Sequence, residues 1–249
     1  MLARDVRGYL ELGVSVAPGD VVVDVGANIG LCALHLLRQT AGELRVVCVE
    51  PVPEIRRVLE RNLAATTAAV VPWAIARAPG RVDITYYPRA PGTSTAHPPS
   101  PANDDWPAVV RAATVADPRF AGLARLLPDA VFRLAARVLR AGARTVACEG
   151  HTMSELIASE RLDRIDLLKL DVEGAEVDAL AGISPDDWPK IAQIVAEVHD
   201  GPRDFETVTS LLAARGLTVQ HVAPVDPASR IRCRTLSARR PERDGRAVR

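Results

Sequence analysis

The decapeptide VVVDVGANIG, residues 21–30, constrains the fold of this chain more than any other stretch. Valines surround Asp24, and Gly26 and Gly30 follow, which predicts a buried strand that turns sharply into a helix over residues 29–39. Gly26 lets the backbone reverse and lets a ligand approach closely, and Gly30 lets the new helix pack tightly on a sheet. Such a turn is typical of folds that cradle a nucleotide.

The ligand of this turn can be narrowed by elimination. A dinucleotide fingerprint needs three glycines, but counting from Gly26 the other two positions hold Asn28 and Leu31. No Gly-Lys-Ser/Thr follows, which argues against a phosphate-binding P-loop. The acid before the turn, Asp24, suits a ligand with positive charge and hydroxyls, and S-adenosylmethionine fits that description. Two other classes stay open: a nicotinamide-dependent Rossmann oxidoreductase and a non-catalytic nucleotide-binding module.

A second apolar strand supports a nucleotide site. Residues 46–49 are Val-Val-Cys-Val, and Glu50 and Pro51 end the strand. An acid at this place is the usual partner of ribose hydroxyls. A helix over residues 53–64 follows, with proline near its start and apolar side chains at helical spacing.

Strands and helices continue to alternate after this point. Residues 69–75 read as a third strand, in which we expect Ala74 to contact the cofactor, and residues 81–87 read as a strand beside the sheet. The alternation predicts an α/β fold with a mostly parallel sheet in a single domain, residues 1–249. A short helix over residues 2–12 would precede it.

The composition limits the class of protein. A chain of 249 residues can bury one sizeable core, and a formal net charge of zero argues against a general nucleic-acid binder. No apolar run is long enough to span a membrane, and the first residues lack the apolar stretch of a signal peptide, so we expect a cytoplasmic protein. The cysteines occur singly and without zinc spacing, which predicts buried reduced thiols: Cys32, Cys48, Cys148 and Cys233.

A different kind of segment interrupts the alternation. Residues 88–107 contain six prolines, which predicts a linker or a mobile loop over the site. Residues 117–140 return to helical periodicity, and Pro128 is placed to start a second helix. We therefore expect residues 88–143 to form an inserted loop and helical lid. Its apolar positions fall on one face: Phe120, Leu123, Leu127, Val131, Leu134 and Val138.

The polar side of this lid is basic. Seven arginines stand against Asp117 and Asp129, an excess of positive charge on a chain whose formal total is zero. An acidic partner would fit, such as a carrier protein that presents a tethered biosynthetic intermediate, and a solvated helical face is the alternative. The arginines are Arg111, Arg119, Arg125, Arg133, Arg137, Arg140 and Arg144.

The stretch IDLLKLDVEGAE, residues 165–176, is the second informative one. A strand over residues 167–170 runs into Asp171 and a new helix. Because parallel strands present ligand-binding residues at their carboxyl ends, Asp171 should face the same crevice as Gly26, with Lys169 one layer below. A strand over residues 191–198 brings further candidates to the same edge, Glu197, His199 and Asp200.

The remaining elements complete the expected sheet. Thr152 and Glu155 form a capping box at the start of a helix. The other expected elements are strands over residues 144–148, 217–222 and 231–236, a helix over 205–215, and a disordered tail over 239–249.

Together these stretches resemble the FkbM family of S-adenosylmethionine-dependent methyltransferases. The matching motifs are Asp24-x-Gly26-Ala27-Asn28-x-Gly30, Glu50-Pro51, Lys169-x-Asp171-x-Glu173-Gly174-Ala175-Glu176 and Glu197-Val198-His199. The resemblance implies a class I methyltransferase sheet of seven strands with the last one antiparallel, and O-methylation of sugars, lipids or natural products. The residues that we expect to bind the cofactor are Asp24, Gly26, Ala27, Asn28, Gly30, Glu50, Pro51, Ala74 and Asp171.

A hydroxyl acceptor must lose a proton, which directs attention to the titratable groups. His199 has the side chain whose usual pKa best suits a base near neutral pH, and Asp171 is either the alternative base or the group that orients His199. The leading prediction includes no metal. As an alternative, Asp171, Glu173 and Asp200 would bind Mg²⁺. Glu173 and Glu176 would otherwise be acids favoured in the first turn of a helix.

Overall fold

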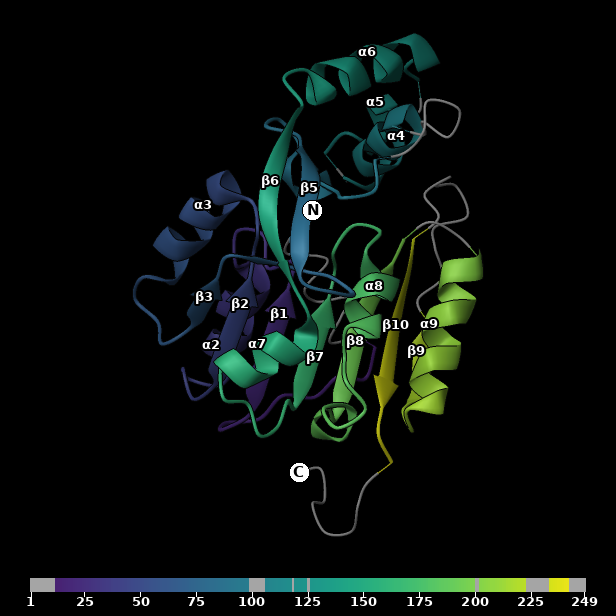
Figure 1. The fold of residues 1–249 in the computed structure, drawn as a ribbon. Coiled ribbons are helices and arrows are strands. Elements are labelled where there is room, and N and C mark those ends of the chain that lie inside the picture. The colour runs from purple at the N-terminus through teal and green to yellow at the C-terminus, as the bar shows by residue number, and fades with distance from the viewer. Residues whose placement is uncertain are drawn as a thin grey trace.

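The architecture is a seven-stranded sheet with helices on both faces (Figure 1). A computed structural model describes residues 12–98, 106–117, 119–124, 126–199, 202–222 and 233–241. The strands follow one another in space as β3, β2, β1, β7, β8, β10 and β9, and β10 is antiparallel to both of its neighbours. This topology confirms the predicted fold, a mostly parallel sheet with an antiparallel last strand.

The elements agree closely with the expected ones. The predicted helix over residues 29–39 begins only at Leu31, because Gly30 caps it in a left-handed conformation. The strands of the large sheet are β1 (Val21–Val25), β2 (Arg45–Val49), β3 (Ala69–Val71), β7 (Leu167–Leu170), β8 (Gln193–Val198), β9 (Thr218–Val222) and β10 (Arg234–Arg239). The helices around it are α2 (Leu31–Gln39), α3 (Pro53–Leu63), α7 (Met153–Ser159), α8 (Glu176–Ala181) and α9 (Pro202–Ala214).

Some predictions concern residues that the structure does not describe. These are Arg125, Asp200, and most of the predicted tail and of the predicted N-terminal helix. The last strand, expected over residues 231–236, continues in its described part to Arg239, the first residue of the expected tail.

Both faces of the large sheet are buried. Side chains of a strand alternate between faces, so Val22 packs toward α2 and Val23 packs toward α7, α8 and α9. The capping box of Thr152 and Glu155 is present at the start of α7, where each side chain accepts the other residue's backbone N–H. Burial on two faces explains why these strands read as continuous apolar runs.

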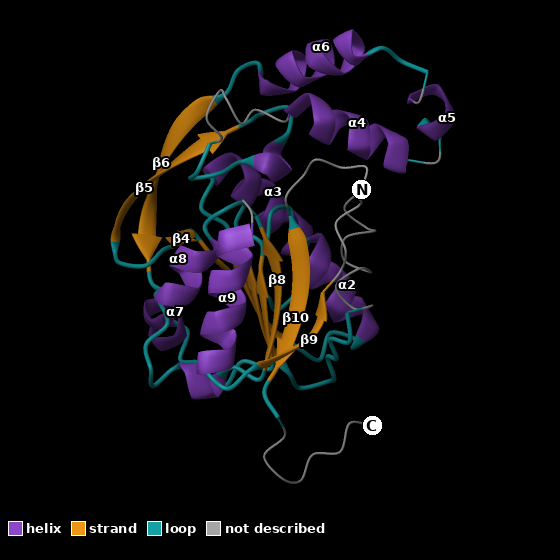
Figure 2. Cartoon of the chain, turned by 90° about the vertical axis from the view of Figure 1, so that its right-hand side faces the viewer, coloured by secondary structure: helices purple, strands orange, loops and turns teal. Residues whose placement is uncertain are grey.

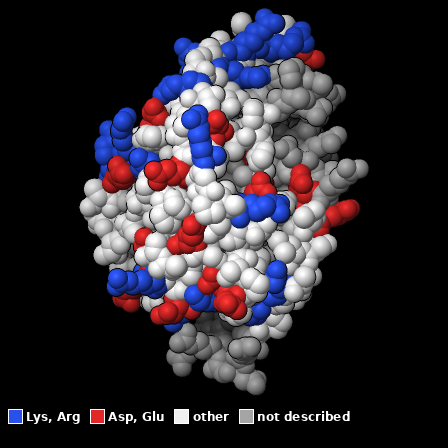
Figure 3. Space-filling view, in the orientation of Figure 1, with Lys and Arg blue, Asp and Glu red and all other residues white. Residues whose placement is uncertain are grey.

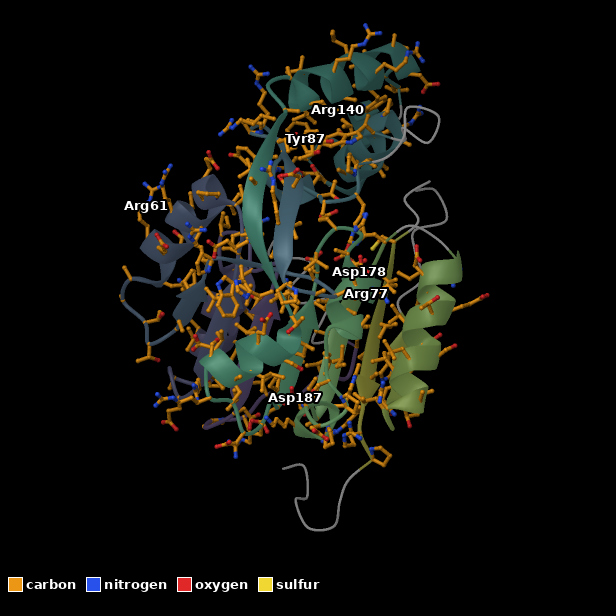
Figure 4. All side chains as sticks on the ribbon, in the orientation of Figure 1. Arg61, Arg77, Tyr87, Arg140, Asp178 and Asp187 are labelled. Atoms are coloured by element: carbon orange, nitrogen blue, oxygen red, sulfur yellow. The ribbon has the colours of Figure 1, made fainter. Side chains whose placement is uncertain are left out.

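A small second sheet corrects the prediction for residues 69–75. The chain there forms two strands, β3 in the large sheet and β4 (Trp73–Ile75) in a three-stranded sheet with β5 (Gly80–Tyr86) and β6 (Arg144–His151). Pro72 separates them, because proline has no N–H to donate to a strand ladder. The predicted strand over residues 144–148 therefore belongs to this small sheet. An ion pair of 2.9 Å between Arg77 and Asp178 ties the small sheet to α8 (Figure 4).

Three helices occupy the far end of the β5–β6 ribbon, away from the large sheet (Figure 2). They are α4 (Trp106–Ala116), α5 (Ala121–Ala124) and α6 (Asp129–Arg140). Tyr87 and Trp106 pack against Ala136 of α6 in a core of their own. The stripe predicted to be apolar in α6 does not face that core: Val131, Leu134 and Val138 are 40%, 63% and 51% exposed. Phe132 and Ala136 are the buried residues of α6.

The two glycines of the β1–α2 turn are required by neighbouring protein. Gly26 has a φ of +73°, and a Cβ there would lie 1.7 Å from the carbonyl oxygen of Asp171. Gly30 has a φ of +84°, and its Cβ would lie 2.7 Å from Leu59 of α3. Gly30 thus allows close packing on a helix rather than on the sheet, and Gly26 allows the end of β7 to approach the turn.

We predict that Gly26→Ala destabilises the protein more than an alanine substitution at a glycine that has a similar positive φ but no close neighbour. Gly19 is the matched control, because its φ is +86° and a Cβ added there would meet nothing within 4 Å. Gly19→Ala should lower the free energy of unfolding by about 1–2 kcal/mol, the cost of a left-handed alanine. Gly26→Ala should cost about 1–3 kcal/mol more because of the collision. Equal losses in urea titrations would show that the contact with Asp171 is easily relieved.

Candidate active site

A cavity opens at the carboxyl ends of β1, β2 and β7. It encloses about 700 Å³ of empty space, part of which is open to solvent. The small sheet forms one wall with Trp73, Val82 and Ile84, and residues 91–96 contribute Pro91, Gly92, Ser94 and Ala96. The ring of Trp73 stacks on His151 with centroids 3.9 Å apart, which fixes this wall.

Most of the residues predicted to bind the cofactor meet at this cavity. Six of the nine predicted residues line it: Gly26, Asn28, Glu50, Pro51, Ala74 and Asp171. Three others are not on its wall: Asp24, Ala27 and Gly30. Ala27 is buried in the hydrophobic core that includes α2 and α3. Gly30 packs against Leu59 of α3. Strand β1, the glycine turn and strand β2 thus meet at the cavity, as the motifs indicated. Asp24, Ala27 and Gly30 instead make packing or ion-pair contacts within the protein.

Asp24 lies below the cavity, in a buried ion pair. Its Oδ1 is 2.9 Å from Nζ of Lys169, and the two side chains are only 1% and 6% exposed. Lys169 also donates to the carbonyl oxygen of Gly26 at 3.0 Å and lies 3.6 Å from Asp171 Oδ2. Burial alone would lower the pKa of Lys169, but the charges of Asp24 and Asp171 raise it above its usual value. The positive partner of Asp24 is therefore a lysine of the protein.

Glu50 is buried at the cavity edge, only 5% exposed. Its carboxylate accepts the backbone N–H of Asn28 at 3.1 Å and that of Val52 at 3.0 Å. Burial raises the pKa of Glu50 to about 7, although both hydrogen bonds oppose this. Asn28 has a φ of +51°, a conformation that side chains other than glycine adopt at a cost. The carboxylate is thus fixed against the glycine turn, with the rest of its accepting capacity available to a ligand.

The Pro-rich segment contributes more than a linker or a mobile loop would. Thr95 is buried, pairs with Thr85 of β5 and donates its hydroxyl to the carbonyl oxygen of Glu173. Glu173 has a φ of +53°, so the loop that accepts this hydrogen bond is held in a conformation that side chains other than glycine adopt at a cost. No local sequence signal indicates this contact, except that the segment follows a strand directly.

His199 lies beside the cavity and not on its wall. Its Nδ1 is 3.1 Å from Oε1 of Glu176, a buried carboxylate that also accepts the backbone N–H groups of Gly174 and His199. Its Nε2 is 3.4 Å from Glu173 Oε2 and 3.8 Å from Glu197 Oε1. Glu176 is thus the group that orients His199, and Asp171 is the predicted base that reaches the cavity.

The charges around His199 bear on its protonation. Burial opposes a charged imidazole, but hydrogen bonds with Cys233 and Glu176 and the charge of Glu173 raise the pKa of His199 well above its usual value. Burial, assisted by the charges of Asp171 and Glu197, raises the pKa of Glu173. A proton therefore stays within this group near neutral pH. When His199 carries that proton, its imidazole has no free lone pair to accept a second one.

Comparison with known proteins agrees with this geometry. The profile of the methyltransferase FkbM domain matches residues 24–219. The 31-O-demethyl-FK506 methyltransferase FkbM of Streptomyces tacrolimicus is 36% identical, over 89% of this chain and 80% of that protein. AMB antimetabolite synthetase AmbE of Pseudomonas aeruginosa is 35% identical over 86% of this chain, which corresponds to 10% of the synthetase.

A solved structure shares the fold. Methyltransferase FkbM from Methylobacillus flagellatus KT superposes with a TM-score of 0.52 at 15% identity, over 90% of this chain. This chain spans 44% of that longer one. In the part of this chain that is described, no helix is both long and apolar enough to cross a membrane. Because the profile covers most of the sequence and a close relative matches along most of its length, the chain belongs to the FkbM family of methyltransferases.

Proposed function

We propose that the protein transfers a methyl group from S-adenosylmethionine to a hydroxyl oxygen of a natural-product, sugar or lipid-like acceptor. The observation that carries this proposal is the buried Glu50 carboxylate, fixed against the glycine turn at the edge of the cavity. An acid in this place suits two ribose hydroxyls, and Gly26 and Asn28 line the cavity beside it. The Streptomyces relative is a 31-O-demethyl-FK506 methyltransferase, which supports an oxygen acceptor.

The carboxylate that lines the cavity at the end of β7 would handle the acceptor. When bound, S-adenosylmethionine supplies an activated methyl group, so the main tasks of the protein are alignment and removal of the hydroxyl proton. Asp171 lines the cavity and is the group we assign as base, with Lys169 3.6 Å from its carboxylate. His199 would act through Glu173, whose carboxylate lies beside its Nε2, and is therefore a positioning residue.

We predict that Glu50→Gln weakens binding of S-adenosylhomocysteine by about 1–3 kcal/mol, because ribose hydroxyls lose a charged acceptor. Glu60→Gln, on the exposed side of α3, is the matched control. Since burial raises the pKa of Glu50 to about 7, affinity of the unmodified protein should fall as the pH decreases through that value. The Gln variant should lose this dependence. Calorimetric titration measures both, and preferential binding of NAD would instead favour the oxidoreductase alternative.

We predict that Asp171→Asn lowers turnover by roughly 10²-fold or more, as expected for loss of a general base. Affinity for S-adenosylhomocysteine should fall much less. The acceptor for the assay would come from mass spectrometry of candidate hydroxyl compounds incubated with isotopically labelled cofactor. If Asp171→Asn kept its turnover while His199→Asn lost it, the base would be His199.

We also propose that the acceptor is delivered by an acidic carrier protein that docks on α6. Arginine side chains gather over this helix (Figure 3). Arg133 and Arg137 are exposed there beside the exposed Leu134 and Val138, and no described residue pairs with either arginine. A surface that mixes apolar and cationic groups fits a partner that is apolar and acidic. The match to one part of the AmbE synthetase supports an acceptor handled within a biosynthetic assembly.

We predict that reversing Arg133 and Arg137 to Glu raises the Michaelis constant for a carrier-bound acceptor roughly 10-fold or more, with little change for the same acceptor in free form. The effect should shrink as salt rises, because exposed charges act over only ~10 Å at 0.1 M. Reversal of Arg57 and Arg61, exposed on α3, is the matched control. Equal effects on both acceptor forms would identify α6 as a solvated face, and binding of the protein to anionic vesicles through these arginines would favour a membrane surface instead.

A further inference from the structure

A second group of ligand-type side chains lies next to the cavity, where β8 meets β10. Glu197 and His199 are two residues apart at the end of β8, so they point to the same face of the sheet. In the antiparallel ladder Thr235 is opposite Glu197 and Arg234 is opposite Val198. Continuing this register places Cys233 beside His199. An imidazole, a carboxylate and a thiol that are remote in sequence are thereby brought together.

Their donor atoms have the spacing of metal ligands. One donor atom from each of Glu197, His199 and Cys233 lies within 4.8 Å of the other two. Cys233 Sγ is 3.0 Å from Glu197 Oε1, and Glu197 Oε1 is 3.8 Å from His199 Nε2. Ligands bound tetrahedrally at about 2.0–2.3 Å lie roughly 3.3–3.8 Å apart. Only small side-chain movements would therefore enclose an ion.

Glu173 supplies a fourth donor. Its Oε2 lies 3.4 Å from His199 Nε2, and its side chain is 29% exposed. It comes from the loop between β7 and α8, so the group gathers three separate segments of the chain: this loop, the end of β8 and the residue before β10. One of its carboxylate oxygens lies within 4.8 Å of donor atoms of His199 and Asp171, so a movement of its side chain toward Glu197 and Cys233 would add a second oxygen to their nitrogen, sulfur and oxygen.

The surroundings of His199 have the arrangement found behind metal ligands. Its Nδ1 is 3.1 Å from the buried carboxylate of Glu176, which leaves Nε2 directed at Glu173 and Glu197. Histidines that bind metals usually donate their other ring N–H to a carboxylate or carbonyl, which fixes the tautomer and the orientation of the ring. Glu176 is in turn fixed by backbone N–H groups of residues 172, 174 and 199.

We infer that Glu173, Glu197, His199 and Cys233 form a binding site for a divalent transition metal of the zinc type. Imidazole and thiolate ligands favour such an ion, whereas Mg²⁺ prefers oxygen ligands alone. This set differs from the Mg²⁺ alternative in that it includes His199 and Cys233. The inference does not depend on the proposed acceptor or cofactor, and a metal here would fix the loop that carries Glu173 beside Asp171.

The test uses Co²⁺ as a spectroscopic probe of the full chain after treatment with a chelator. We expect one equivalent of Co²⁺ to bind with a thiolate-to-cobalt charge-transfer band, and Zn²⁺ to displace it. Cys233→Ser should abolish the band and weaken binding at least about 10-fold, whereas Cys32→Ser, at another half-buried cysteine, should change neither. Absence of the band, or equal Co²⁺ binding by the protein and Cys233→Ser, would overturn the inference.

Two more variants guard against a misfolded serine variant. Glu197→Gln removes a ligand and should weaken Zn²⁺ binding. Glu176→Gln weakens only the orientation of His199, and this variant should reduce Zn²⁺ affinity by roughly 10–100-fold. Circular dichroism should show native secondary structure for each. If both variants bind Zn²⁺ as tightly as the unmodified protein, or if Mg²⁺ competes with Co²⁺ at equal concentration, the site is not of the proposed kind.

Discussion

The buried ion pair between Lys169 and Asp24 is the interaction on which the site depends. The two residues are opposite each other in the register of β7 and β1, and both side chains are almost fully enclosed. Removal of one partner from such a pair leaves an uncompensated buried charge, which costs about 3–5 kcal/mol. The same ammonium group also holds the carbonyl oxygen of Gly26 and lies close to Asp171. One cation thus fixes the glycine turn and the end of β7 relative to each other.

Two regions with different chemistry lie on either side of this anchor. Glu50 is held by backbone N–H groups at the edge of the cavity, in surroundings that include Val49, Val52 and Ile55. On the other side a dense group of ionisable side chains surrounds His199, and Asp171 stands between that group and the cavity. In the proposed function the first region recognises the nucleotide and the second serves the acceptor, so each would be altered separately by substitution. The short segment that contains Thr95 lines the cavity and is tied to the second region, because Thr95 donates its hydroxyl to the carbonyl oxygen of Glu173.

The local pattern of the sequence is enough to predict the strands beside the glycine turn, the turn itself, and the positions of Glu50 and Asp171 at the ends of their strands, because strand and turn signals are short-range. It does not predict that Pro72 divides a strand between two sheets, since the partner strand β6 lies far along the chain. The pattern around Asp24 suggests a cationic ligand, but its partner Lys169 is 145 residues away. The stripe of Val131, Leu134 and Val138 has ordinary helical periodicity and yet faces solvent, because α6 packs through Phe132 and Ala136. Periodicity identifies a helix face without revealing what covers it.

The proposed function depends on binding of S-adenosylmethionine through Glu50, in the cavity beside the glycine turn. A crystal structure of the protein with S-adenosylhomocysteine tests this most directly. We predict both ribose hydroxyls within hydrogen-bonding distance of the Glu50 carboxylate and the homocysteine end directed toward Asp171. A ligand bound elsewhere, or bound in the cavity with its ribose turned away from Glu50, would contradict it.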